Sequence, residues 1–266
     1  MSTTAPGAGY LFAELGDLVR HQAASRSAAY DPFTTERLAA TGVGDGWHCL
    51  EVGAGEGEIA RWLAARVAPT GEVLATDLTP ERVAGAPGLR VERHDIARDP
   101  LPAGAFDLVH ARLVLQLLPE RRAVLERLRQ ALRPGGWIQI DEFDVSYGPV
   151  LTAPTEAAAE LYRTFLTAKN RAFAATGAHP VWGREAAADL AAAGFTALDP
   201  QPRIVLWRAG HPGLELLVSH TRTLRDQLLA EGLTDGQLAE VRALLRHPGF
   251  AAASCVMYSV QARRPS

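Results

Sequence analysis

The chain has 266 residues, a formal net charge of -3 at pH 7, a hydrophobic content of 47% and a charged content of 21%, which is the composition of an ordinary globular protein. A pI near 6.2 and the lack of a basic cluster argue against a nucleic-acid partner. The apolar runs are far shorter than the roughly 20 residues of a membrane-spanning helix, so no membrane partner is expected.

The first 45 residues are predicted to form an N-terminal helical cap. Residues 10–40 suit two or three short helices with a break at Asp31-Pro32, because proline interrupts a helix interior. The opening MSTTAPGAGYLFAELGDL has neither the charged region nor the apolar core of a signal peptide. We therefore expect a cytoplasmic protein.

Strands and helices alternate from residue 46 to residue 145, which is typical of an α/β fold with a doubly wound, mostly parallel sheet, here expected to have seven strands. Apolar residues at helical spacing predict helices from Glu58 and over 119–132, with a short helix at 80–84. In such sheets ligands bind beyond the carboxyl ends of the strands. The predicted strands of this region are 47–52, 72–77, 89–95, 106–111 and 137–143.

Residues 146–266 are expected to complete the same domain. Helical inserts at 150–180 and 210–247 suit either a lid or a dimer contact, so a monomer and a homodimer both stay open. Cys49 and Cys255 lie in apolar stretches and are predicted to be buried, reduced thiols. The predicted helices are 154–176, 184–193, 212–230 and 235–246, and the closing strands are 203–207 and 253–263.

The stretch LEVGAGEGEIARWL at 50–63 is a glycine-rich turn between a strand and a helix. The third glycine of a dinucleotide fingerprint would fall at position 58, which is Glu58 here. A carboxylate about 4 Å from a phosphate would oppose its binding by about 4 kcal/mol at an effective dielectric near 20. The turn therefore favours a positive or neutral ligand such as S-adenosylmethionine over NAD. Alternatively, the glycines only allow tight packing and the glutamates only stabilise a helix N-terminus.

Two further acids end predicted strands. Asp77 follows Gly55 by 22 residues and could accept both hydroxyls of a ribose; alternatively it caps the helix at 80–84, a role that Thr79 suits better. Asp95 could accept from an adenine amino group while the Ile96 N–H meets a ring nitrogen. The alternative for Asp95 is a solvated turn residue.

Over about residues 47–143 the chain resembles class I S-adenosylmethionine-dependent methyltransferases. The resemblance lies in the order and spacing of five successive motifs, EVGAGEG, ATD, HDI, FDLVHA and LRPGGWIQI. The resemblance is to the small-molecule branch and implies a Rossmann-like methyltransferase fold, S-adenosyl-L-methionine as cofactor and S-adenosyl-L-homocysteine as product. It implies that Glu51, Gly53 and Gly55 face the methionine part, that Asp77 binds the ribose, and that His110 lines the floor between cofactor and acceptor. The full predicted cofactor site is Glu51, Gly53, Ala54, Gly55, Gly57, Asp77, Leu78, Asp95, Ile96 and His110.

Methyl transfer from a sulfonium is an in-line displacement, in which alignment alone contributes about 7–11 kcal/mol and a general base about 10²–10⁴-fold. His110 and Glu142 are the predicted catalytic residues, with His179 and His220 as further base candidates and no metal site expected. His110 could instead only hydrogen-bond to cofactor or backbone. The acids Asp141, Glu142 and Asp144 could hold an amine or a phenol, or lie in a helix cap or a solvated loop.

The expected acceptor is a small organic molecule, a natural product of secondary metabolism, methylated at O, N or C. Arg112 could bind its carboxylate, although a surface ion pair is the alternative. The other predicted acceptor-binding residues are Tyr10, Phe12, Tyr30, Phe143, Tyr147, Trp182 and His220, with Trp207 as a further aromatic wall. Competing hypotheses are cyclisation or decarboxylation on the same scaffold and a non-catalytic partner.

Overall fold

The computed structural model describes residues 16–266, and the predicted acceptor-binding residues Tyr10 and Phe12 lie outside them. The chain divides into two compact units. The sheet unit comprises Asp31–Phe143, Val181–Arg203 and Met257–Ser266. Among the described residues, the helical unit comprises 16–30, Asp144–Pro180 and Ile204–Val256. The predicted boundary at 145 lies close to a boundary between units, whereas the one at 45 does not.

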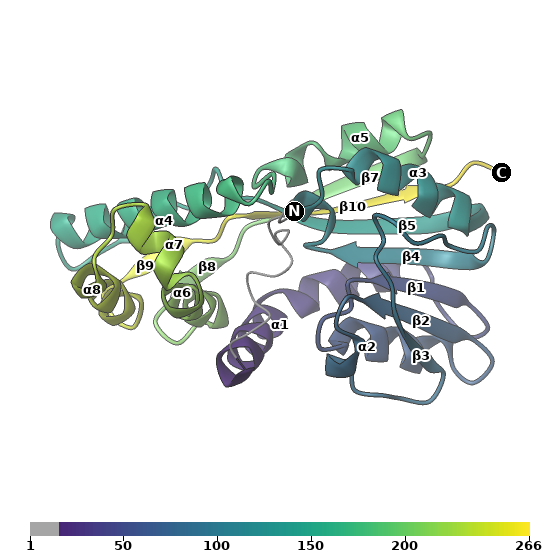
Figure 1. Ribbon diagram of the computed structural model, residues 1–266, viewed down its shortest axis with the longest axis horizontal. Coiled ribbons are helices and arrows are strands. Elements are labelled where there is room, and N and C mark those ends of the chain that lie inside the picture. Colours follow the sequence, from purple (N-terminus) through teal and green to yellow (C-terminus); the bar gives the residue numbers. More distant parts are fainter. Residues whose placement is uncertain (1–15) are drawn as a thin grey trace, which may run out of the picture. The chain divides into compact units, whose positions relative to one another are not determined.

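The sheet unit contains a mostly parallel sheet, whose strands lie side by side in Figure 1. Within residues 16–266 it has seven strands in the order β3-β2-β1-β4-β5-β10-β7, which confirms the predicted fold class. The chain moves outward from β1 to β3 and then returns to the other side of β1 with β4, so the switch point lies between β1 and β4. The strands are β1 (His48–Val52), β2 (Glu72–Asp77), β3 (Leu89–Arg93), β4 (Phe106–Arg112), β5 (Leu132–Asp144), β7 (Thr196–Arg203) and β10 (Val256–Arg263).

Helices cover both faces of this sheet because successive strand residues point to opposite faces. Cys49 packs with the end of α1 (Gly16–Ala40) and with α2 (Glu58–Val67). Its neighbour Leu50 packs on the opposite face with α3 (Arg121–Ala131) and α5 (Ala186–Ala192). Within residues 16–266 there are three single-turn helices: η2 (Pro80–Arg82), η3 (Leu115–Leu117) and η4 (Trp182–Arg184).

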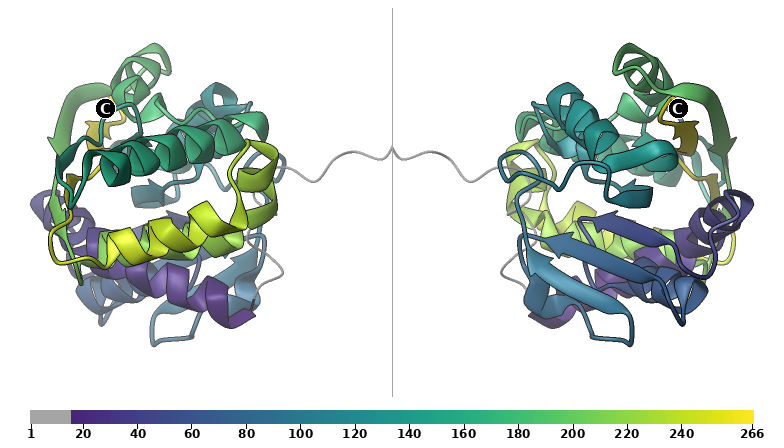
Figure 2. Two further views of the ribbon diagram at one scale, coloured as in Figure 1. Left: turned by 90° about the vertical axis from the view of Figure 1, so that its left-hand side faces the viewer. Right: turned by 90° about the vertical axis from the view of Figure 1, so that its right-hand side faces the viewer.

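The helical unit holds a small antiparallel sheet, ordered β6-β9-β8, and a group of helices that pack on one another (Figure 2). Thr155 caps the helix that begins at Glu156, and Thr234 forms a capping box on the helix that begins at Asp235, which fixes where these helices begin. No helix within residues 16–266 combines the length and apolarity needed to cross a membrane. The elements are β6 (Val150–Thr152), α4 (Glu156–Ala175), β8 (Leu206–Arg208), α6 (Pro212–Thr223), α7 (Arg225–Ala230), α8 (Asp235–Leu245) and β9 (Ala251–Ala253).

The predicted break at Asp31-Pro32 is wrong, because α1 runs through Pro32 as one helix of 25 residues. An interior proline costs about 3 kcal/mol. The residues around it offset that cost: Asp31 pairs with Arg112 at 2.7 Å, and the Thr34 hydroxyl donates to Asp141 at 2.7 Å.

Three other boundaries also differ from prediction. In place of the closing strand predicted at 203–207, the structure has β7, which ends at Arg203, and β8, which begins at Leu206. Strand β7 contains Pro200 and Pro202, which a strand at the edge of a sheet tolerates because one side needs no hydrogen bonds. Strand β5 begins at Leu132, which pairs with Phe106 before the register shifts. The helix predicted over 212–230 is divided at Leu224 into α6 and α7.

Candidate functional site

The glycine turn joins β1 to α2 at the switch point of the sheet. Gly53, Gly55 and Gly57 have φ angles of +68°, +59° and +84°, in the left-handed region that glycine adopts at little cost. A Cβ atom on Gly53 would lie 2.4 Å from Val114 Cγ2, beyond the end of β4. The turn therefore needs glycine both for its backbone conformation and for its close approach to the loop after β4.

Four amide groups of this turn already have acceptors within the protein. Gly53 and Ala54 donate to one carbonyl of β2 at 2.8 and 3.0 Å, and Gly57 donates to the carbonyl of Ala54 at 2.9 Å. Gly55 donates to Asp77 Oδ2 at 2.9 Å. A phosphate cradle needs such N–H groups free. The geometry therefore fits the predicted ligand without phosphate.

Asp77 ends β2 and fastens the turn. Besides the bond from Gly55, its Oδ1 accepts from both the N–H and the hydroxyl of Thr79 at 2.9 Å, so Thr79 does not act as the predicted side-chain cap of η2. An ionised carboxylate has about four acceptor positions, and three of them are used. Leu78 beside it is 42% exposed, an apolar surface at the carboxyl end of β2.

Asp95 lies in a turn after β3. Its Oδ1 accepts from the N–H of Ala97 at 3.0 Å, and its Oδ2 lies 3.5 Å from Arg98. Ile96 is buried, and its carbonyl accepts from Arg127 at 2.9 Å. The alternative of a turn residue is thus observed for Asp95, and its contact with adenine stays a prediction.

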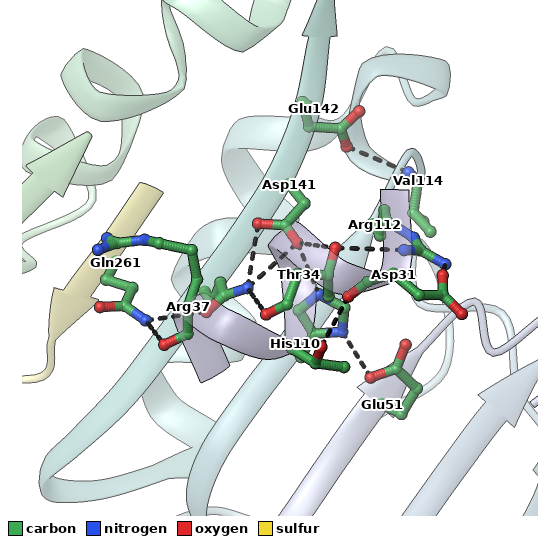
Figure 3. A network of polar contacts seen from close by, with 12 residues as sticks. Asp31, Thr34, Arg37, Glu51, His110, Arg112, Val114, Asp141, Glu142 and Gln261 are labelled. Carbon is green, nitrogen blue, oxygen red and sulfur yellow. Dashed lines mark hydrogen bonds and ion pairs between the residues drawn. The ribbon is translucent and has the colours of Figure 1, made fainter. Parts of the chain in front are cut away.

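A buried polar network joins the ends of β1, β4 and β5 (Figure 3). His110 Nδ1 lies 2.6 Å from Glu51 Oε2, and His110 Nε2 lies 3.3 Å from Asp141 Oδ2. Asp141 also accepts from the Thr34 hydroxyl at 2.7 Å and from the Gln139 amide at 3.1 Å. All five side chains are buried. Sequence reasoning missed Thr34 and Gln139, which have no motif and are brought together only by the fold.

His110 is charged in this environment. Burial alone would lower its pKa, but the charge of Glu51 and the hydrogen bonds to Asp141 and Glu51 outweigh burial and raise the pKa to about 9. For Asp141, an acid, burial alone would raise the pKa, but its hydrogen bonds to His110 and Thr34 hold that pKa below the usual value. The structure therefore places an imidazolium between two carboxylates, with both ring nitrogens occupied. The role of His110 as a base stays a prediction.

Glu142 differs from its neighbour Asp141. Its Oε1 accepts from the N–H groups of Val114, Leu115 and Gln116 at 3.1, 2.8 and 3.3 Å. Its Oε2 is buried and has no hydrogen-bond partner among residues 16–266. Burial raises the pKa of Glu142 to about 8 despite those three N–H donors. Of the neighbouring acids Asp141 and Glu142, Glu142 is therefore the one whose pKa is raised toward neutral pH.

The backbone beside Glu142 is strained. Leu113, between β4 and η3, has a φ of +57°, which costs about 1–3 kcal/mol for a residue with a side chain. Its N–H donates to the carbonyl of Asp141 at 2.9 Å, which holds the turn in place. Such strain is concentrated at functional sites.

The predicted acceptor-binding residues are divided between the two units. In the sheet unit, Arg112 forms an ion pair with Asp31, but the pair is largely buried and is not the surface ion pair of the alternative. Trp182 is 1% exposed in the core, where its Nε1 donates to Asp189 at 2.8 Å. Phe143 is half-buried at the end of β5.

The other predicted residues belong to the helical unit. The Tyr30 hydroxyl is buried 3.9 Å from the sulfur of Cys255, and Tyr147 is 44% exposed. Burial and the charges of Lys169 and Arg26 lower the pKa of His220 to about 3, so this histidine is neutral. Sequence reasoning missed Lys169, whose only signal was that no other lysine occurs in the chain.

Residues 50–138 match a family described as "Methyltransferase domain". Trans-aconitate 2-methyltransferase of Deinococcus radiodurans is 34% identical over 185 residues, which cover 65% of this chain and 67% of that protein. Methyltransferase str3 of Strobilurus tenacellus is 36% identical over 114 residues, or 42% of this chain and 41% of the relative. The chain thus spans about two fifths of the length of str3.

Solved structures with similar folds share little sequence with this chain. YcgJ protein from Bacillus subtilis has a TM-score of 0.56 at 12% identity, covering 87% of this chain and 97% of its own. A SAM-dependent methyltransferase from Aquifex aeolicus has a TM-score of 0.50 at 15% identity, and the match covers 92% of this chain and 99% of that one. At such identities the likeness concerns the fold.

Proposed function

This chain belongs to the S-adenosylmethionine-dependent methyltransferases, and we propose that it methylates an O, N or C atom of a small organic acceptor, with Glu142 handling the acceptor's proton. The cofactor supplies an electrophilic methyl group on a sulfonium. The protein's own residues must hold that cofactor, align the acceptor, exclude water and accept any proton that the acceptor releases.

The proposed cofactor residues follow the strand ends. The turn from Gly53 to Gly57 would hold the methionine part, Asp77 and Leu78 the ribose, and Asp95 with Ile96 the adenine. The occupied amides of the turn support a ligand without phosphate. Because Asp77 already accepts three hydrogen bonds, a two-hydroxyl contact with ribose requires it to give up a bond from Thr79.

Glu142 carries the proposal for the chemistry. Three N–H groups fix Oε1, which leaves Oε2 as a buried oxygen without a partner among the described residues. With a pKa of about 8, the carboxyl is protonated at neutral pH and can donate a hydrogen bond, and at higher pH it is a carboxylate that can accept a proton. His110 would act as a positioning residue, because its contacts with Glu51 and Asp141 hold β1 and β5 to β4.

A small acceptor is supported by the relatives and by the charge of the chain. The names of two relatives refer to small molecules, namely trans-aconitate and, for a Cupriavidus necator protein 30% identical over 127 residues, ubiquinone and menaquinone biosynthesis. The net charge of -3 is unfavourable for binding a nucleic acid, which leaves a small molecule as the better-supported acceptor. We propose a natural-product acceptor of secondary metabolism.

The test is incubation with S-adenosylmethionine labelled in its methyl group and a panel of small phenols, amines and carboxylic acids, followed by mass spectrometry. Transfer of the label to one acceptor class is the expected result. Turnover of an acceptor without label would show a cyclisation or decarboxylation instead. Failure to bind S-adenosylhomocysteine in calorimetry would leave a non-catalytic partner.

A further inference from the structure

The sheet unit has a pocket of about 220 Å³ at the edge of the sheet where the parallel strands begin, and all its lining residues belong to that unit. Trp47 directly precedes β1, Asp107 is near the start of β4, and Trp137 lies in β5. Strand β5 also carries Glu142, and from residue 137 to residue 142 a strand spans roughly 16 Å. This pocket, called the amino-edge pocket, is therefore separate from the cofactor edge.

Two indole rings form the apolar part of the amino-edge pocket. Trp47 and Trp137 both pack against the core on the α2 side of the sheet, and both stay half-buried. Aromatic side chains that keep an accessible surface in a concave site are typical of small-molecule binding. Because a cavity of about 150 Å³ holds a benzene ring, about 220 Å³ accommodates one ring with a small substituent.

Backbone hydrogen bonds fix the end of β10 beside this pocket. The N–H of Gly135 donates to the carbonyl of Arg264 at 3.0 Å, and the N–H of Arg264 donates to the carbonyl of Gly136 at 2.9 Å. The side chain of Arg263 is held as well, because its Nη1 donates to the carbonyl of Gly135 at 2.9 Å. The wall that carries Arg263 is thus already ordered, and a ligand does not need to order it.

Arg263 is the charged group of the pocket that lacks a counter-ion. Its guanidinium lies 4.0 Å from the centre of the Trp137 ring, and no carboxylate of residues 16–266 forms an ion pair with it. The other cation of the pocket, Arg133, contacts both oxygens of Asp107 at 2.6 Å. Asp107 also accepts from the N–H of His48 at 2.7 Å. The charges of Arg133 and Asp107 therefore balance each other, and the charge of Arg263 is surplus.

The guanidinium of Arg263 suits a carboxylate. It has five N–H donors in one plane, and the bond to the carbonyl of Gly135 uses one of them. A guanidinium that lies over an aromatic ring keeps its edge free for acceptors in its own plane. A carboxylate matches two parallel N–H groups of that edge.

We propose that the amino-edge pocket binds a small aromatic monocarboxylate, with its ring against Trp47 and Trp137 and its carboxylate on Arg263. One negative charge matches the surplus guanidinium, whereas a phosphate monoester would bring a second negative charge beside Asp107. The inference does not depend on the proposed function, because no lining residue belongs to the proposed cofactor or acceptor site.

The test is a titration of the full chain with benzoate, followed by NMR of the tryptophan indole N–H groups. The signals of Trp47 and Trp137, assigned with Trp47→Phe and Trp137→Phe, should shift saturably with a dissociation constant on the order of 1–10 mM, as expected for so small a ligand. The chain has five tryptophans, so Trp62, Trp182 and Trp207 are internal controls whose signals should not move. Neutral benzamide should bind at least about threefold more weakly, the modest change typical of an ion pair near the surface.

Substitutions of Arg263 test the counter-ion. Arg263→Met should lower the affinity for benzoate to that for benzamide, and Arg263→Lys, which keeps the charge but not the planar group, should lie between the two. Arg203→Met is the matched control and should bind benzoate as wild type does. Arg203 also stacks on an aromatic ring, Phe33 at 4.3 Å, but it pairs with Glu36 and lies beside the opposite end of β10.

The inference would be overturned if the signals of Trp47 and Trp137 showed no saturable shift up to about 50 mM benzoate. Equal affinity for benzoate and benzamide would overturn it too, as would an unchanged affinity in Arg263→Met or an equal loss in Arg203→Met. Saturating S-adenosylhomocysteine should not displace benzoate. Displacement would place the benzoate at the cofactor edge and would likewise contradict the proposed pocket.

Discussion

Replacing His110 by glutamine is expected to destabilise the protein and to weaken the pH dependence of its stability. His110 is completely buried between Glu51 and Asp141, at 2.6 and 3.3 Å. Glutamine can hydrogen-bond but carries no charge, so both carboxylates would stay buried without a cation. Removing one partner of a buried ion pair costs about 3–5 kcal/mol of unfolding free energy.

The pH dependence follows from the direction of the pKa change. The folded pKa of His110 is raised to about 9 from an unfolded value of 6.5. The stabilisation is therefore fully present below pH 6.5 and is lost as the pH rises to 9. The difference between the two pKa values corresponds to about 3 kcal/mol.

Urea unfolding followed by tryptophan fluorescence at pH 6.0, 7.5 and 9.5 measures this effect. The difference in unfolding free energy between wild type and His110→Gln should shrink by about 3 kcal/mol from pH 6.0 to pH 9.5. His220→Gln is the control of opposite sign, because the folded pKa of His220 is lowered to about 3 while the unfolded histidine still binds a proton near pH 6.5. The unfolding free energy of wild type relative to His220→Gln should therefore rise, by less than about 1 kcal/mol, from pH 6.0 to pH 9.5. A difference for His110→Gln that is the same at pH 6.0 and pH 9.5 would refute the imidazolium.

Three other substitutions probe the cofactor edge of the sheet. Asp77→Ala should weaken S-adenosylhomocysteine binding at least about tenfold in calorimetry. Asp45→Ala is the control and should leave binding unchanged: Asp45 accepts from the N–H and hydroxyl of Thr70, as Asp77 does from those of Thr79, but it lies before β1. Glu142→Gln keeps an acceptor for the three N–H groups, so it should fold normally but lose about 10²–10⁴-fold in kcat/KM together with any rate change centred near pH 8; an unaltered pH–rate profile would contradict the role of this residue. Gly53→Ala should lower the free energy of unfolding in urea by about 1–3 kcal/mol more than Gly104→Ala does. Both glycines have a positive φ, but only a Cβ atom at Gly53 meets a neighbouring side chain.

The parallel part of the fold could be predicted from the sequence because its signals are local. Strand β2 begins and ends at the predicted residues 72 and 77, and α2 begins at Glu58 as predicted. In both, apolar periodicity and turn residues decide the structure within a few positions. The continuous α1 and strand β7 were missed because contacts with distant residues override the local effect of proline.

The site was predictable where residues follow strands and unpredictable where partners come from elsewhere in the chain. The glycine turn and Asp77 lie together as expected, 22 residues apart in sequence and linked by a hydrogen bond. The two carboxylates that hold His110 come from separate strands, 59 and 31 residues away. Whether a histidine is a free base or a fixed cation depends on such partners, and single-sequence periodicity does not report them.

The consecutive acids of β5 show how these partners assign a chemical role. Asp141 accepts from the charged His110 and from Thr34, so it is held as a carboxylate. Glu142, equally buried, receives only neutral amide N–H groups on one oxygen, and its pKa is raised to about 8. Two groups whose pKa values are moved in opposite directions are suited to different tasks. Because Asp141 is locked to His110 while Glu142 keeps one oxygen without a partner in the described chain, a proton exchanged at this end of the sheet goes to Glu142 in the mechanism that we propose.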